Sequence, residues 1–502
     1  MDKWVHRILC ILTLSVFALI FIQEKTHFVH FEPLGGVVED VAWPKITMKR
    51  YIDRSYQTNL EKYSKQRFGF RECFIRCYNQ YLWDVYGVSS VDGVSVGHDG
   101  WLYEPWFVDE YYNGLMYKAT DDSEFYKGTL RKEAVRLYKL QEVLKSLGIT
   151  LFVMIEPGKE RVYPEHLPDR KRYEIDGVRP VDYYPYLFDS LGINYVDFSK
   201  YFVEQKGKVD YPLFPQTGTH WSNIAATHVA DSLIRYMEAI GNMNINNLEI
   251  GEPYFDSTRK PDDDLEKMMN LLREIPKSPN MYADVSVVND STALMPKLLI
   301  NGDSFFWNII NQMDMDSVFS KWQYWYYNST IYHNADYYST SDVDYAAELL
   351  GSDYVVLSYC TAMIYGLGYG FIPRALVSLC CDNNQIDEAI NSVIADMNGS
   401  EEWMAYLRNK ANEEGRELND VMYQDAKFYL FDNLETKFPE LSIQGIPAAR
   451  NDICIKSIKS KIYNNHDWIC EIRQQAEEWN VPLDTAVTRN AIWYYNQHKS
   501  EY

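Results

Sequence analysis

The chain has 502 residues, of which 46% are hydrophobic and 24% are charged. This length exceeds what one hydrophobic core normally absorbs, so we expect more than one domain, and the apolar content excludes a disordered chain. The 49 basic and 71 acidic residues give a formal net charge of −22, which argues against binding to nucleic acid or other polyanions. A neutral or cationic substrate fits this charge better.

The N-terminal segment contains an uncharged apolar run at residues 8–22. With its apolar flank, the run approaches the roughly 17 residues that a membrane-spanning helix needs. Lys3 and Arg7 precede it, which predicts a cytoplasmic N-terminus and an exported chain after Glu24. A cleaved signal peptide is the alternative, but no small-residue cleavage site follows. We therefore expect a single-pass membrane anchor with the bulk of the chain periplasmic or on the cell surface.

The eight cysteines do not follow the spacing of a metal site or a dense disulfide scaffold. Cys73 and Cys77 lie four positions apart, and Cys380 and Cys381 are adjacent, so pairing is open and the connectivity cannot be read. The chain also has no glycine-rich phosphate loop or dinucleotide fingerprint. We expect neither a metal nor a cofactor.

After an extended tether that reaches residue 44, residues 45–86 have helical spacing of aromatic and leucine side chains, with Gly87 as the helix exit. Asp99-Gly100, between two short apolar stretches, predicts a β-hairpin over residues 94–103. A helix over residues 132–147 leads into an apolar run at residues 149–155, which is typical of a strand buried on both faces.

This helix–strand unit recurs along the chain. A second helix ends near Leu191 and leads into a strand at residues 193–196, and further buried strands are predicted at residues 297–300 and 354–357. Alternation of this kind predicts an α/β domain with a mainly parallel sheet, whose chemistry lies at the carboxyl ends of the strands. We place this domain at residues 45–385, after a stub, anchor and tether at residues 1–44.

The last part of the chain, residues 386–502, contains a repeat. Residues 403–429 and 468–494 align at an offset of 65, so that Trp403 meets Trp468 and Tyr429 meets Tyr494. Each copy shows one helical stripe behind a helix that begins with a tryptophan. We expect a helical module made of one two-helix unit used twice, suited to docking or to proximity to the wall or membrane, without chemistry of its own.

Two side chains form the candidate catalytic pair. Ser304 follows the strand at residues 297–300 in a Gly-Asp-Ser turn, which frees its hydroxyl from the strand. A serine needs an adjacent base, and His220 is the best of the ten histidines because it lies in a loop just before a helix, where Ser222 suits the N-cap.

Four motifs together resemble the SGNH-hydrolase-like domain of the AlgJ and AlgX alginate O-acetylation proteins, also described as DHHW-like. The histidine motif precedes the serine, which distinguishes this family from ordinary SGNH esterases, and the resemblance covers roughly residues 65–375. The motifs are the Gly302-Asp303-Ser304 turn, Gly218-Thr219-His220-Trp221, the hairpin from Gly97 to Tyr103, and Pro157-Gly158-Lys159-Glu160 with Tyr163-Pro164.

The resemblance implies a flavodoxin-like domain outside the cytoplasmic membrane that transfers acetyl groups onto a polysaccharide. It also implies a membrane-bound O-acyltransferase partner that supplies acetyl from the cytoplasm. Ser304 would be the nucleophile and His220 the general base.

One position departs from the family motif, which has an aspartate two residues before the histidine where this chain has Gly218. Loss of a triad carboxylate can cost about ten-thousandfold in rate. Three explanations stay open: another carboxylate takes the role, with Asp197 at a strand end as our candidate; a Ser–His dyad suffices; or activity is lost.

Three further residues are candidates for substrate or oxyanion contact. Lys159 matches the family's lysine motif and Trp221 adjoins the histidine. Asn334, in Tyr332-His333-Asn334, could donate to an oxyanion.

We therefore expect a membrane-anchored O-acetyltransferase or acetylesterase that acts on polysaccharide hydroxyls through an acetyl-serine intermediate. The alternative is an inactive SGNH-like glycan-binding or scaffold protein, which Gly218 favours. No motif in the sequence identifies the glycan or distinguishes transfer from hydrolysis.

Overall fold

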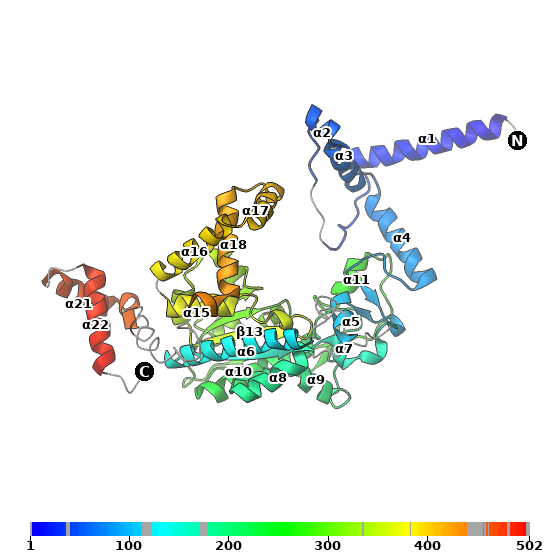
Figure 1. Cartoon of the computed structure of the whole chain (residues 1–502). Helices are drawn as coiled ribbons and strands as arrows, with labels where there is room; N and C mark the ends of the chain where they lie inside the picture. The colour runs from blue at the N-terminus through cyan, green and yellow to red at the C-terminus, as the bar shows by residue number, and fades with distance from the viewer. Residues whose placement is uncertain are drawn as a thin grey trace.

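The computed structural model describes residues 3–36, 41–112, 123–170, 179–333, 336–381, 383–438, 455, 458–459, 461–478 and 482–497. Four helices lead from the N-terminus toward an α/β body (Figure 1). They are α1 (Lys3–Thr26), α2 (Met48–Ile52), α3 (Ser55–Gln66) and α4 (Arg71–Tyr86). Among the described residues, α1 is the one helix long and apolar enough to cross a membrane, over Trp4–Thr26.

Helices α2 to α4 replace the continuous helical segment predicted for residues 45–86. Arg54 and Phe70 have φ angles of +65° and +63°, which lie outside the range of a right-handed helix. The helical conformation is therefore interrupted just before α3 and just before α4. Helix α4 ends at Gly87, with φ +64°, as the sequence predicted.

The centre of the body is a seven-stranded sheet in the order β12-β11-β10-β9-β13-β3-β4. The strands from β10 to β4 in this order are parallel, and β11 and β12 add an antiparallel edge. The strands are β3 (Thr150–Glu156), β4 (Tyr195–Asp197), β9 (Lys297–Gly302), β10 (Lys321–Tyr326), β11 (Thr330–His333), β12 (Asp336–Ser339) and β13 (Tyr354–Cys360). Strands β3, β4, β9 and β13 confirm the four predicted from apolar runs.

Alternate side chains of the sheet pack into two separate hydrophobic cores. On β3, Leu151, Val153 and Ile155 enter one core, whereas Phe152 and Met154 enter the other. The first core is covered by α6 (Ser123–Ser146), α8 (Pro180–Leu191), α14 (Tyr345–Leu350) and α15 (Phe371–Cys380). The second is covered by α9 (Phe198–Gln205), α10 (Asn223–Gly241), α12 (Phe306–Gln312) and α13 (Met315–Val318). Helices on both faces explain why the parallel strands are continuous apolar runs.

Smaller elements complete the body around the sheet. The predicted hairpin is present, with Asp99 and Gly100 at φ +55° and +75° in its turn. These elements are β1 (Ser95–Val96), β2 (Leu102–Tyr103), α5 (Pro105–Tyr111), α7 (Lys159–Val162), β5 (Asn247–Ile250), β6 (Tyr254–Asp256), α11 (Asp264–Met269), β7 (Asn280–Tyr282) and β8 (Val285–Val288). Short 3-10 turns lie at His98–Gly100, Pro164–His166, Thr340–Asp342 and Ile364–Gly366.

The C-terminal region is helical and contains the predicted repeat. The ring centroids of Trp403 and Tyr429 lie 5.0 Å apart at 55°, and those of Trp468 and Tyr494 lie 5.2 Å apart at 56°. The helices of this region are α16 (Asn383–Asn398), α17 (Glu401–Glu414), α18 (Leu418–Asp432), α19 (Leu434–Lys437), α21 (His466–Glu478) and α22 (Leu483–Gln497). The ring geometry is nearly the same in the two copies, and the use of one two-helix unit twice stays a prediction.

The two copies differ in how they join the body. Side chains of α16 to α19, including Leu407 and Leu430, belong to the same hydrophobic core as the sheet, whereas α21 and α22 have a small core of their own. The domain boundary at residue 385 remains a prediction, and the main core continues across it.

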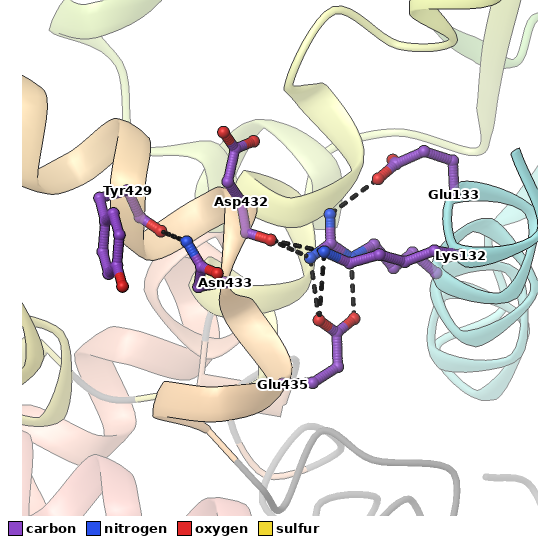
Figure 2. A network of polar contacts seen from close by, with 7 residues as sticks. Lys132, Glu133, Tyr429, Asp432, Asn433 and Glu435 are labelled. Carbon is purple, nitrogen blue, oxygen red and sulfur yellow. Dashed lines mark hydrogen bonds and ion pairs between the residues drawn. The ribbon is translucent and has the colours of Figure 1, made fainter. Parts of the chain in front are cut away.

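A buried arginine strengthens this junction (Figure 2). Arg136 on α6 is 2% exposed; its Nε and Nη2 donate to the two Glu435 carboxylate oxygens at 2.8 and 2.9 Å. Nη2 also donates to the Asp432 carbonyl at 2.9 Å, and Nη1 donates to Glu133 at 2.8 Å. The first repeat copy is therefore fixed to α6 by both apolar packing and charge-assisted hydrogen bonds.

Seven of the eight cysteines fall within the described part of the chain, and no disulfide joins any two of these seven. Cys454 lies outside the described residues.

Candidate functional site

The turn after β9 presents Ser304 at the carboxyl edge of the sheet. A Cβ on Gly302 would lie 2.8 Å from the Ser358 carbonyl oxygen, so only glycine fits where β9 ends beside β13. The buried Asp303 carboxylate accepts from the amides of Phe305 and Cys360 at 3.0 and 2.8 Å. Asp303 thus shapes the turn and leaves the hydroxyl of Ser304 directed toward His220.

His220 lies in the loop before α10. Ser222 caps this helix by accepting from the Ala225 amide at 3.2 Å, which fixes the loop end as expected. His220 Nε2 lies 2.9 Å from Ser304 Oγ, within hydrogen-bond distance. The two side chains paired in the sequence analysis, 84 positions apart, therefore meet.

The acid beside His220 is Asp264, the first residue of α11. Its Oδ2 lies 2.8 Å from His220 Nδ1. Its Oδ1 accepts from the amides of Thr219 and Leu265 at 2.8 and 2.7 Å. An ionised carboxylate only accepts hydrogen bonds, so Nδ1 carries the proton and Nε2 is free to accept from Ser304. Ser304, His220 and Asp264 form the geometry of a nucleophile–base–acid triad.

Asp197, our candidate for this acid, lies elsewhere. It is the N-cap of α9, where its carboxylate accepts from the Lys200 amide at 2.8 Å. The strand end that suggested Asp197 belongs to β4, at the edge of the sheet, where β13 and β3 separate it from β9. The position beside His220 is held by Asp264 instead.

Gly218 explains why the acid comes from another segment. A Cβ at this position would lie 2.8 Å from both the Asp262 carbonyl oxygen and Pro215 Cγ. The chain that supplies Asp264 therefore occupies the space that an aspartate side chain at position 218 would need. The same packing thus accounts for the glycine at position 218 and for the placement of Asp264 beside His220.

Opposing effects set the pKa of His220. Burial alone would lower it, but the hydrogen bond and the charge of Asp264 raise it, with further contributions from Asp303 and Glu104. The net result is a pKa above the usual 6.5 of histidine. Asp264 therefore makes the imidazole a stronger base than a buried histidine without a carboxylate would be.

Lys159 holds the histidine loop rather than facing a substrate. Its side chain is 2% exposed, and Nζ donates to the carbonyls of Leu102, Gln216 and Gly218 at 2.7, 2.9 and 2.9 Å. All three ammonium protons are used, and burial lowers the pKa of Lys159 well below its usual value. The predicted substrate or oxyanion role is thus wrong: Lys159 ties the hairpin to the loop that carries His220.

Two other predicted contacts do not fall in an accessible site. Trp221 is completely buried and packs against Phe202 and Phe305, so it fills the core behind His220 instead of contacting substrate. Asn334 lies outside the described residues.

Helix α11, which carries the acid, is braced by the N-terminal helices. Asn79 on α4 donates to the Met269 carbonyl at 2.7 Å, and Gln80 accepts from the amides of Leu272 and Arg273, each at 3.0 Å. Asn270 exchanges two hydrogen bonds with the backbone of Gly35, at 2.7 and 3.2 Å. The position of Asp264 thus depends on α4 and on the segment that follows α1.

Buried carboxyl groups lie behind the nucleophile turn. Burial, reinforced by the charge of Asp303, raises the pKa of Glu156 well above its usual value, and Ser358 donates to Glu156 at 2.6 Å. Burial also raises the pKa of Glu110 on α5 to about 7 and that of Glu160 on α7 to about 8. Burial thus favours the neutral form of these carboxyl groups.

Residues 94–298 match the family model of the SGNH hydrolase-like domain of the acetyltransferase AlgX. This part of the chain is similar to the AlgX-type SGNH hydrolase-like domain. The predicted resemblance to the AlgX and AlgJ family is thereby confirmed. The match includes His220 and Asp264 and ends before Ser304. No curated protein matches the chain.

Three solved structures are similar to the chain at low identity. The O-acetyltransferase domain of Pseudomonas putida AlgJ is 16% identical, covering 54% of this chain and 92% of that one, with a TM-score of 0.36. Pseudomonas aeruginosa AlgX is 14% identical, covering 56% of this chain and 65% of that one, at 0.33. A DHHW family protein from Eubacterium siraeum is 15% identical, covering 48% and 87%, at 0.30.

Proposed function

We propose that this chain is an extracytoplasmic O-acetyltransferase or acetylesterase that acts on polysaccharide hydroxyls through an acetyl–Ser304 intermediate. The observation that carries the proposal is the continuous line of hydrogen-bond distances from Ser304 through His220 to Asp264. The match to the AlgX-type domain supports polysaccharide O-acetylation as the general activity.

In the first half-reaction, His220 Nε2 takes the proton of the Ser304 hydroxyl as Oγ attacks the acetyl carbonyl of a donor ester. Because the Phe305 and Phe306 amides donate to Asp303, we assign stabilisation of the oxyanion to the amide of Ser304 itself. Collapse of the tetrahedral intermediate breaks the ester bond, and imidazolium returns the proton to the leaving alcohol. Asp264 stabilises the imidazolium and holds its orientation.

In the second half-reaction, His220 removes a proton from an acceptor hydroxyl, which attacks the acetyl–Ser304 ester and releases the free serine. A sugar hydroxyl gives transfer, and water gives hydrolysis. The membrane location that we propose rests on α1, and the family resemblance implies a membrane-bound O-acyltransferase as acetyl donor. Both lie within the proposal.

The test compares Ser304→Ala with Ser317→Ala, a matched serine on the surface helix α13. We expect Ser304→Ala to abolish turnover of p-nitrophenyl acetate and labelling by a fluorophosphonate, and Ser317→Ala to keep both. Acetylation of oligosaccharides in the presence of the acetyl ester then distinguishes transfer from hydrolysis. Equal turnover by both variants contradicts the proposal.

The alternative of an inactive glycan-binding or scaffold protein depended on the missing aspartate at Gly218. Asp264 supplies a carboxylate at hydrogen-bond distance from His220, which removes that support. Absence of phosphonate labelling at Ser304 in the folded wild-type chain is the result that would restore the alternative.

A further inference from the structure

The segment between α1 and the body has helices that bury nothing. Neither α2 nor α3 has a single buried side chain. The exposed apolar groups lie on α2 and just before it: Met48 is 77% exposed, Ile52 72% and Trp43 63%, whereas Leu60 and Tyr63 on α3 are half-buried. Short helices gain most of their stability from packing, so helices with unpacked apolar side chains indicate a surface outside the chain.

The charge of this segment is opposite to that of the protein. Residues 43–76 contain nine basic and three acidic side chains, a net charge of +6 within a chain of −22. Most of these cations are solvated, including Lys49, Arg50 and Lys62. A local excess of Lys and Arg with exposed aromatic and aliphatic groups matches an anionic lipid surface.

Packing against α1 places this segment at the end of the apolar helix. A Cβ on Gly69 would lie 2.1 Å from the Ile20 carbonyl oxygen and 2.8 Å from the Glu24 amide nitrogen, so the α3–α4 corner contacts the last turns of α1. Phe70 packs against Phe28 just after α1. Figure 1 shows α2 and α3 beside the C-terminal end of α1, with α4 leading away toward the body.

We propose that residues 43–76, which we call the collar, bind the anionic surface of the membrane around the exit of α1. The exposed apolar side chains of α2 and of the residues just before it enter the interfacial region, and the cations of the collar contact lipid phosphates. This inference goes beyond the catalytic proposal and rests only on its membrane anchoring. It gives α4, and through α4 the acid-bearing helix α11, a fixed position relative to the bilayer.

The test uses the full-length chain in nanodiscs of phosphatidylcholine alone or mixed with phosphatidylglycerol. Amide hydrogen exchange of residues 43–66 is the readout, since backbone amides of an unsupported helix exchange quickly. We expect exchange at least about tenfold slower in the anionic discs, because each Lys or Arg near an anionic surface strengthens binding by about fivefold.

A triple variant, Lys49→Ser, Arg50→Ser and Lys62→Ser, should lose this difference. A control with the same charge change on exposed lysines of the body, at positions 145, 200 and 208, should keep it. Equal exchange in both kinds of disc overturns the proposal. Exchange that is slow in both kinds of disc and unchanged in the triple variant also overturns the proposal. That result would indicate that the collar contacts protein instead of lipid. Intact mass shows independently whether α1 is retained, and exchange is measured without reference to acetyl transfer.

Discussion

Asparagine in place of Asp264 tests the acid without changing its shape. Asn keeps a carbonyl oxygen for the amides of Thr219 and Leu265, but sets an NH2 group in the place of Oδ2, 2.8 Å from His220 Nδ1. Two donors cannot face each other, so the imidazole must move its proton to Nε2. Nε2 then faces Ser304 as a donor and can no longer take the hydroxyl proton.

The expected loss follows from the same geometry. Removing the charge of a triad carboxylate while keeping its shape costs about ten-thousandfold in kcat. Because the Asp264 side chain is 27% exposed, water screens part of its charge. We therefore expect a reduction of about 10³- to 10⁴-fold, equal to about 4–5.5 kcal/mol in the activation free energy.

The assay is turnover of p-nitrophenyl acetate between pH 5 and 9. In the wild type, kcat/KM should rise with pH as His220 loses its proton, with a midpoint above 6.5 because Asp264 raises the pKa of this histidine. Asp197→Asn is the control: it weakens the cap of α9 and should keep activity within about twofold. A folded Asp264→Asn variant within about tenfold of wild type, or an equal loss from Asp197→Asn, would refute the assignment of the acid.

Three further predictions concern support of the site and of the fold. Gln80→Ala removes the acceptor of two amides behind α11, so it should lower kcat about tenfold and lower the midpoint of the pH profile. Tyr81→Ala, at the exposed neighbouring position, should change neither quantity. Unchanged kinetics in both variants would contradict the support of α11 by α4. Arg136→Ala leaves carboxylates without their buried partner and should lower the free energy of unfolding by about 3 kcal/mol, measured by urea denaturation; a change under about 0.5 kcal/mol would contradict its structural role. Burial raises the pKa of Glu110 to about 7 and of Glu160 to about 8, so the folded state holds protons that the unfolded state releases. Stability should thus fall as pH rises from about 4.5 toward 7 and 8, by up to about 1.4 kcal/mol per pH unit for each proton, and should level off above about 8. Glu110→Gln should flatten this dependence, and an unaltered slope would contradict the assignment.

The parallel strands were predictable where the sequence consists of unbroken apolar residues. Strand β10 was missed because Lys321 and Gln323 interrupt its aromatic residues. Gln323 is nevertheless buried, since its amide donates to Glu348 at 2.8 Å and accepts from the Trp325 indole at 2.9 Å. A polar side chain with partners from other elements looks like a solvent-facing residue until the fold is known.

The catalytic pair was predictable because each member follows a local signal, a strand end for Ser304 and a helix start for His220. Asp264 carries no such signal. It lies in a run of charged residues, Lys260 to Glu266, that resembles a solvated loop, and its contact with the histidine depends on how that run folds. Only the gap left by Gly218 hinted that a carboxylate had to come from elsewhere.

The separate origin of acid and base affects how relatives of this chain are classified. A pattern search that requires aspartate and histidine within one short motif would set such sequences aside as degenerate enzymes. In this chain, such a search would score Gly218 as a lost catalytic residue. Gly218 instead leaves room for the segment that carries Asp264, since any larger side chain there would collide with that segment. A glycine two residues before the histidine, together with an acidic run midway between the histidine and the serine, is therefore a signature worth searching for among sequences that lack the aspartate.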